Sequence, residues 1–272
     1  MSADDRRKWD ARYRDGAGPG NEPSYFLRSL DAVLPRRGRA LDLAGGAGRN
    51  ALWLAHRGLD VTLTDISPVG LARAASEAQR AGVALTTVEC DLEEQLAPPG
   101  PWDLLLCFHY LHRPLYAQIP GLLAPGGLLI VVHPTRSNLL RHPSPSARFL
   151  LEDGELPTLV QDLTHGVMAD AVILTVGVLQ TDLVPLALMM TRKGGTCVVT
   201  AMTPLSQMTV PMSLTEFVNS AKTLKGTLYG QMNARASMPM LLSMYQAGTL
   251  RLDELVTRRY RLDDINEVLD LK

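Results

Sequence analysis

Asp42-Leu43-Ala44-Gly45-Gly46-Ala47-Gly48 is the stretch that decides the fold of this chain. The apolar run 39–43 leads into it and predicts a strand, and the run 49–57 after it has a helical pattern. A glycine-rich turn between a strand and a helix lets the backbone approach a ligand and directs helix N-terminal amides at it. We therefore expect a ligand-binding loop at the first turn of an α/β fold.

The same alternation of strand and helix continues on both sides of this loop. The predicted strands are 39–43, 60–64, 84–90, 102–107 and 128–133, and the predicted helices are 49–57, 68–81 and 114–123. Residues 135–146 are rich in Pro, Ser and Arg and predict a loop. Strands that alternate with helices predict an α/β, Rossmann-like, doubly wound and mostly parallel sheet.

Composition limits the classes of partner. The chain has 272 residues, a net charge of -1 and 46% hydrophobic residues. Such a weak charge argues against nucleic acid and anionic membranes as partners, and no apolar run is long enough to span a bilayer, so we expect a cytoplasmic protein. The three cysteines (Cys90, Cys107 and Cys197) are far apart, which argues against a disulfide framework and against a metal site.

Composition also changes along the chain. Apart from Met1, every methionine lies at or after Met168, whereas the three tryptophans (Trp9, Trp53 and Trp102) all lie early. Further strand and helix patterns follow the change, with strands at 170–176, 196–202, 224–229 and 255–261 and helices at 182–190, 213–220, 238–247 and 263–271. We therefore predict two segments of different ancestry, 1–155 and 156–272.

The glycine loop by itself fits two classes of cofactor. It matches the dinucleotide pattern G-x-G-x-x-A, with Asp65 at the distance of a ribose-binding acid. Asp42, however, would repel a pyrophosphate and suits a ligand that carries an ammonium and a sulfonium. Asp65 and Asp91 end the second and third strands, so the three acids should line one edge of the sheet, where doubly wound folds bind ligands. This arrangement favours S-adenosylmethionine.

Three stretches together resemble the class I S-adenosylmethionine-dependent methyltransferases, of the tellurite-resistance and thiopurine type. They are 40–50 around the glycine loop, 123–129 with the turn Ala-Pro-Gly-Gly, and the opening 9–24 with Trp-Asp-Ala-Arg-Tyr. The resemblance covers residues 6–155. Ala44 stands where that family has its first glycine, and alanine is tolerated there if its φ is negative. The cofactor-binding residues that the resemblance implies are Asp42, Gly46 and Gly48 for the methionyl part, Asp65 for the ribose, and Asp91 and Leu92 for the adenine. Ile66 is a further cofactor-binding candidate. Trp9 and Tyr13 are candidates for a lid over the cofactor, with ordinary packing of an N-terminal helix as the alternative.

Methyl transfer requires an acceptor held in line with the methyl group, and a base only where the acceptor arrives protonated. The family places acceptor-facing residues at 108–110, so His109 is the candidate base, and a structural histidine is the alternative. His112 lies three residues further on, but the sequence offers no third ligand and we expect no metal. The prediction is methyl transfer to a small-molecule acceptor.

The second segment resembles a different family. Residues 163–177, 193–199 and 224–230 look like the back half of the cofactor domain of medium-chain, zinc-dependent alcohol dehydrogenases. The resemblance covers 161–270 and implies that Val176, Gly177, Ala201 and Met202 line a nicotinamide pocket. That family's own glycine finger and zinc-binding catalytic domain do not precede this stretch. The chain therefore looks like a chimera, with a nicotinamide-binding oxidoreductase fragment or an inactive chimera as the alternative functions.

Such a joining would leave the strand 128–133 as an apolar edge, which is an aggregation hazard. A parallel strand at 170–176 can pair there and extend the sheet. Residues Leu224 to Tyr229 resemble a strand that, in the dehydrogenase family, pairs edge to edge with the same strand of a twofold partner. We therefore predict a homodimer through residues 224–229.

Overall fold

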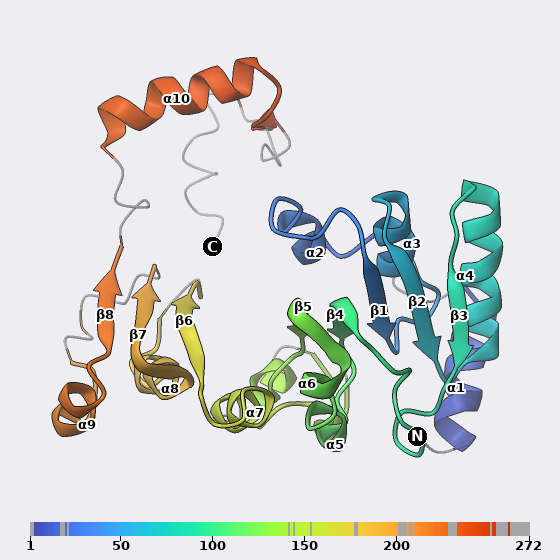
Figure 1. Cartoon of the computed structure of the whole chain (residues 1–272), viewed down its shortest axis with the longest axis horizontal. Helices are drawn as coiled ribbons and strands as arrows, with labels where there is room; N and C mark the ends of the chain where they lie inside the picture. Colours follow the sequence, from blue (N-terminus) through green and yellow to red (C-terminus); the bar gives the residue numbers. More distant parts are fainter. Residues whose placement is uncertain are drawn as a thin grey trace.

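The computed structural model describes residues 3–16, 20, 22–140, 142–143, 145–152, 154–176, 179–200, 206, 209–227, 233–250, 252–253 and 261. Its first segment forms a parallel five-stranded sheet in the order β3-β2-β1-β4-β5, flanked by helices (Figure 1). The strands are β1 (Arg39–Leu43), β2 (Asp60–Asp65), β3 (Thr86–Glu89), β4 (Trp102–Phe108) and β5 (Leu123–Val132). The helices are α1 (Ala3–Arg14), α2 (Tyr25–Ser29), α3 (Arg49–His56), α4 (Pro68–Ala81), α5 (Arg113–Tyr116) and α6 (Ile119–Leu122). This confirms the predicted α/β, Rossmann-like class.

The strand order reverses between β1 and β4, which pair side by side although β2 and β3 separate them in sequence. Their loops leave the sheet in opposite directions, and such a switch point opens a crevice at the carboxyl ends of the strands. The glycine loop follows β1 and His109 follows β4, so both flank this crevice. The sheet is buried on both faces, because β1 and β4 consist almost wholly of buried residues.

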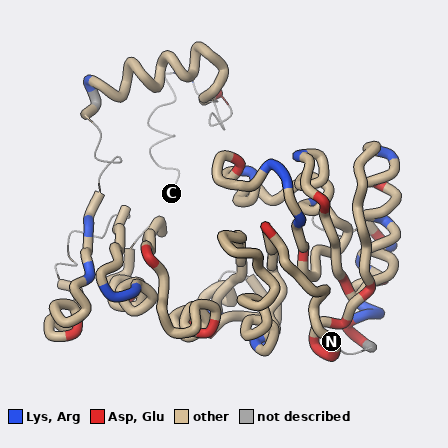
Figure 2. The backbone as a smooth tube through the Cα atoms, viewed as in Figure 1, with Lys and Arg blue, Asp and Glu red and all other residues tan. Residues whose placement is uncertain are grey.

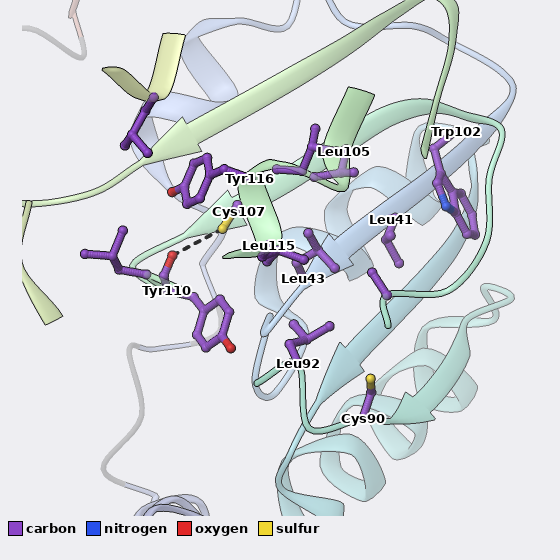
Figure 3. Close-up of a cluster of buried hydrophobic side chains, with 14 of the residues drawn as sticks. Leu41, Leu43, Cys90, Leu92, Trp102, Leu105, Cys107, Tyr110, Leu115 and Tyr116 are labelled. Carbon is purple, nitrogen blue, oxygen red and sulfur yellow. Dashed lines mark hydrogen bonds between the residues drawn. The ribbon is translucent and has the colours of Figure 1, made fainter. Parts of the chain in front are cut away.

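One side of the sheet is covered by a cluster of buried side chains that includes Leu41, Leu105 and Tyr116 (Figure 3). All three cysteines are free and buried. Burial raises the pKa of the Cys107 thiol to about 12, so it stays protonated at neutral pH.

The predicted helix 114–123 is wrong as a single element. Two short helices, α5 and α6, replace it, and Pro120 lies in the first turn of α6. A proline inside a continuous helix would remove one backbone hydrogen bond and clash with the preceding turn. In the first turn of a helix it has neither effect.

The second segment builds a separate parallel sheet in the order β6-β7-β8 (Figure 1). Its elements and the preceding link are η1 (Arg136–Leu140), η2 (Ala147–Phe149), α7 (Leu156–Leu163), β6 (Ala169–Leu174), α8 (Leu183–Met190), β7 (Thr191–Val199), α9 (Leu214–Asn219), β8 (Thr223–Gly226) and α10 (Ala234–Gln246). The predicted strand 255–261 and helix 263–271, together with Gly177, Ala201 and Met202, lie outside the described residues, apart from position 261.

The expected extension of the first sheet by a strand of the second is wrong in the described residues. β6 pairs with β7 in its own sheet, and β5 remains an edge. β5 and β6 do not pair because α7 separates the two sheets. This helix packs against both α5 and α8. Leu159 and Leu163 of α7 pack into the first segment's core, whereas the cluster around Ala187, Leu188 and Cys197 forms a separate core.

Charges are mixed in sign along the first segment, and α10 carries a single one, Arg235 (Figure 2). None of the described helices combines the length and the apolarity that a membrane crossing needs.

Candidate functional site

The glycine loop turns sharply because three of its residues have positive φ. Gly46 and Gly48 have φ of 64° and 78°, which glycine adopts without strain. Ala44 has a φ of 51°, so the expectation of a negative φ there is wrong. The turn bends at this residue immediately after β1, and the alanine side chain bears the steric strain that the usual glycine avoids.

The loop packs so closely that side chains do not fit at its glycines. A Cβ built on Gly48 would lie 2.8 Å from the Cβ of Ala74 in α4. A Cβ built on Gly46 would clash with the hydroxyl of Tyr13 in α1. The glycines are therefore required by contacts with two helices as well as by their φ angles.

Asp42, the last residue but one of β1, is fully buried beneath this loop. A Cβ built on Gly45 would lie 2.5 Å from the carboxylate oxygen Oδ2 of Asp42. Neither carboxylate oxygen has a hydrogen-bond partner among the described residues. Burial, and then the charge of Asp65, raise the pKa of Asp42 to about 7. A buried carboxylate without a partner is costly, so this side chain is suited to a cationic or hydrogen-bond-donating partner.

Asp65 ends β2 and is also buried, but its carboxylate has partners. The Gly46 N–H donates to Oδ2 and the Ser67 N–H donates to Oδ1, each at 2.9 Å. Burial raises the pKa of Asp65, and these two donors oppose the rise. Asp65 thus joins the glycine loop to the start of α4, with Ile66 buried next to it.

Of the two predicted lid residues, Tyr13 contacts the glycine loop and Trp9 contacts Tyr13. Tyr13 is buried against Gly46 and Gly70, and Trp9 stacks on it with ring centroids 5.8 Å apart. The Ser67 hydroxyl donates to Asp10, which fixes α1 to the beginning of α4. The N-terminal helix therefore covers the loop.

Asp91 and Leu92 follow β3, at the same carboxyl edge of the sheet as Asp42 and Asp65. Asp91 is half-buried, and its Oδ1 accepts the Glu93 N–H at 3.0 Å. Leu92 is buried in the hydrophobic core. The structure thus brings Asp42, Asp65, Gly46 and Tyr13 together, whereas Asp91 lies at the neighbouring strand end.

His109 follows β4 with a φ of 58°, a strained value for a residue with a side chain. Its N–H donates to the Val132 carbonyl at 2.7 Å, which holds it at the end of β5. The residue as a whole is exposed, but the surrounding atoms partly desolvate its imidazole ring. Partial burial, and then the charge of Arg49, lower the pKa of His109. In the described part of the chain no group of three or more His, Cys, Asp or Glu side chains could hold a metal ion.

Two further polar residues lie at this edge: Tyr110, which the sequence placed only within the acceptor-facing stretch 108–110, and His133, which it did not single out. The Tyr110 hydroxyl is buried with no hydrogen-bond partner among the described residues, and burial and the charges of Glu93 and Asp91 raise its pKa. Figure 3 shows its ring beside Leu92. His133 follows β5, and its Nε2 lies 2.6 Å from the Phe149 carbonyl oxygen. The only available signal was position, since each follows a strand at the same edge as His109.

Comparison with known proteins gives two kinds of match. Residues 40–127 match the family model described as a methyltransferase domain. The tRNA 5-carboxymethoxyuridine methyltransferase of Escherichia coli is 30% identical over 138 residues, covering 46% of this chain and 53% of that protein. Among solved structures, TehB from Haemophilus influenzae is similar with a TM-score of 0.43 and 20% identity, over 49% of this chain and 48% of that one.

The second kind of match is to dehydrogenases. Alcohol dehydrogenase B of Mycobacterium tuberculosis is 43% identical over 108 residues, which cover 40% of this chain and 29% of that protein. The NDMA-dependent alcohol dehydrogenase of Amycolatopsis methanolica is 42% identical over 113 residues and 30% of its length. The chain therefore spans less than a third of these dehydrogenases and about half of the methyltransferase.

Proposed function

We propose that the first segment binds S-adenosylmethionine at the carboxyl edge of the five-stranded sheet and transfers its methyl group to a small-molecule acceptor. One observation carries the proposal: Asp42, a buried acid whose two oxygens have no partner among the described residues, lies under the glycine loop, in the stretch that matches a methyltransferase-domain model. The cofactor supplies an electrophilic methyl group on a sulfonium, and the chain has to bind and orient it.

The residues present fit this cofactor. Asp42 offers its carboxylate to the ammonium group, an interaction that would offset the cost of its burial. Each Asp65 oxygen accepts one backbone N–H and retains a lone pair for a ribose hydroxyl. Asp91, Leu92 and the Tyr110 hydroxyl would contact the adenine. Three acids at neighbouring strand ends disfavour a pyrophosphate, which supports this cofactor over a dinucleotide.

His109 would act on the acceptor. Its strained backbone is a feature that often accompanies functional positions. A lowered pKa keeps its imidazole neutral at pH 7, as a general base requires. Trp9 and Tyr13 would cover the bound cofactor, since α1 already lies against Gly46.

Calorimetry with S-adenosylhomocysteine tests cofactor binding. We expect binding by the full chain, loss of binding in Asp65→Ala, and normal binding in Asp60→Ala, which removes an acid from the opposite end of β2. NAD is titrated separately. Binding of NAD without S-adenosylhomocysteine would overturn the proposal and favour the oxidoreductase alternative.

Transfer itself is tested with methyl-labelled S-adenosylmethionine and a panel of small acceptors, with tRNA as a further arm because one relative is named for it. We expect label in a small molecule, and a loss of about 100-fold in His109→Gln with cofactor binding unchanged. Label in tRNA would contradict the acceptor class. Cofactor binding without transfer to any acceptor would favour the inactive chimera.

We also propose that the chain joins a methyltransferase piece to the back half of a dehydrogenase cofactor domain. The support is the identity of 43% to a dehydrogenase over a stretch that covers only 29% of that protein. On this view the second segment serves as scaffold, and a homodimer forms through β8. β8 is the last strand of its sheet in the part of the chain that the structure describes, and its four residues are exposed, which suits a twofold partner there. Light scattering that finds a monomer at micromolar concentration would contradict the dimer.

A further inference from the structure

The two acids beneath the glycine loop are almost closed off from solvent. Asp42 is fully buried, and Asp65 is 6% exposed. Both belong to the proposed cofactor site. A ligand can contact a carboxylate only where the oxygens are accessible, so a ligand that binds Asp65 first has to displace the residues that cover this acid.

Two side chains of α1 lie over Asp65. The Tyr13 ring lies against Gly46, whose N–H donates to Oδ2 of Asp65. Asp10 accepts the hydroxyl of Ser67, whose N–H donates to Oδ1 of Asp65. Burial, and then the charge of Asp65, raise the pKa of Tyr13, which agrees with a phenol that lies beside this acid. The helix therefore occupies the approach to Asp65 and has to move before a ligand can enter.

Polar contacts hold most of α1 in place. Tyr13 is the one residue of this helix that is buried, among those that the structure describes. Figure 1 shows α1 next to the end of β3, where Arg6 forms an ion pair with Glu89. Asp5 forms a second ion pair with Arg148, at 3.0 Å. Segments with few buried apolar contacts open at a lower free energy than global unfolding requires, so α1 can open while the sheet stays folded.

Arg148 is a well-fixed anchor for α1. It belongs to η2 in the link after β5, and the nearby Leu150 and Leu151 are buried. Its guanidinium lies over the Phe149 ring, 4.2 Å from the centroid. The side chain of Asp5 is 15% exposed, and partly buried pairs are screened less by salt than exposed ones. The pair thus fastens the N-terminal helix to a segment 143 residues further along the chain.

We infer that α1 is a gate over the cofactor site and that the Asp5–Arg148 ion pair is the latch that keeps it closed. The inference rests on the proposed function, because it states what controls entry to that site. In the closed form Tyr13 lies over Gly46. In the open form the ion pair is broken and the helix has left Asp65. At high ligand concentration the opening of α1 then limits the rate of cofactor entry.

Hydrogen exchange of the full chain without ligand tests the latch. We expect Arg148→Gln to speed exchange in α1 about two- to fivefold, as the loss of one partly exposed ion pair should. Arg148→Glu should speed it further, because it brings two like charges together. Arg136→Gln is the matched control, since it breaks an ion pair with Glu152 that is also 3.0 Å long and lies within the link. Equal exchange in α1 of Arg148→Gln and Arg136→Gln would overturn the latch.

Stopped-flow tryptophan fluorescence with S-adenosylhomocysteine tests the gate, because Trp9 lies in α1 and reports its movement. We expect the observed binding rate to level off as ligand concentration rises. The final level should be about two- to fivefold higher in Arg148→Gln and unchanged in Arg136→Gln. A rate that stays proportional to ligand concentration, with the same slope in all three proteins, would overturn the gate.

Calorimetry distinguishes a failed gate from a failed cofactor assignment. If the proposed function is wrong, S-adenosylhomocysteine gives no binding signal in any variant. If only the gate is wrong, the ligand binds at equilibrium and the binding rate does not respond to Arg148→Gln. Circular dichroism of each variant verifies folding.

Discussion

At the scale of single residues, the backbone of Ala44 carries strain that glycine would relieve. A left-handed conformation costs a residue with a Cβ about 1 kcal/mol relative to glycine. Because Ala44 has a φ of 51°, we expect Ala44→Gly to raise the free energy of unfolding by about that amount. Ala75→Gly in the exposed interior of α4 should lower it by a similar amount, and denaturant titration compares the two. A loss of stability in Ala44→Gly would contradict the assigned conformation.

Asp42 makes stability depend on pH. Its pKa rises from 3.8 unfolded to about 7 folded, so the native state binds more protons between these values. Stability should therefore fall as pH rises from 4 to 7, by an amount on the order of 4 kcal/mol, and the full penalty applies above pH 7. Asp42→Asn should flatten this slope, measured by denaturant titration at several pH values, and should lose S-adenosylhomocysteine binding. A slope unchanged in Asp42→Asn would contradict the raised pKa.

At the scale of elements, Ser67 has two functions. Its buried hydroxyl accepts the Gly70 N–H at 3.1 Å, capping α4, and donates to Asp10 of α1. Ser67→Ala should lower the free energy of unfolding by about 1–2 kcal/mol and speed hydrogen exchange in α1. Ser213→Ala is the matched control. Ser213 caps α9 in the second segment, so its loss should leave hydrogen exchange in α1 unchanged. Equal exchange rates for α1 in both variants would contradict the link.

The elements also show how far the sequence predicts the structure. The central strands β1 and β4 could be predicted because burial on both faces makes them nearly continuous apolar runs, and Asp42 and Asp65 followed from the strand ends. The break at Pro120 and the positive φ of Ala44 depend on local geometry that periodicity does not report. The contact of His133 with Phe149 joins residues brought together only by the path of the chain after β5.

At the scale of the whole molecule, two cores should unfold separately. All three tryptophans lie in the first segment, so their fluorescence reports the first sheet, whereas circular dichroism reports both. Leu188→Ala removes a buried side chain from the second core, at a cost of about 2–5 kcal/mol. We expect it to shift the circular dichroism transition to lower denaturant and to leave the fluorescence midpoint in place. Leu105→Ala should move the fluorescence midpoint, and coincident shifts in Leu188→Ala would show a single cooperative unit.

The position of α7 has a consequence for the order in which the protein is made. Leu159 and Leu163 complete a core whose other residues are translated earlier. During synthesis, domains generally fold from the N-terminal side as they leave the ribosome. A nascent chain that has emerged only to residue 155 still exposes the apolar surface that these leucines cover, and a chaperone can bind it there. The apolar core of the first sheet is complete only once Leu163 has emerged, so a fragment that contains this sheet should end after that residue.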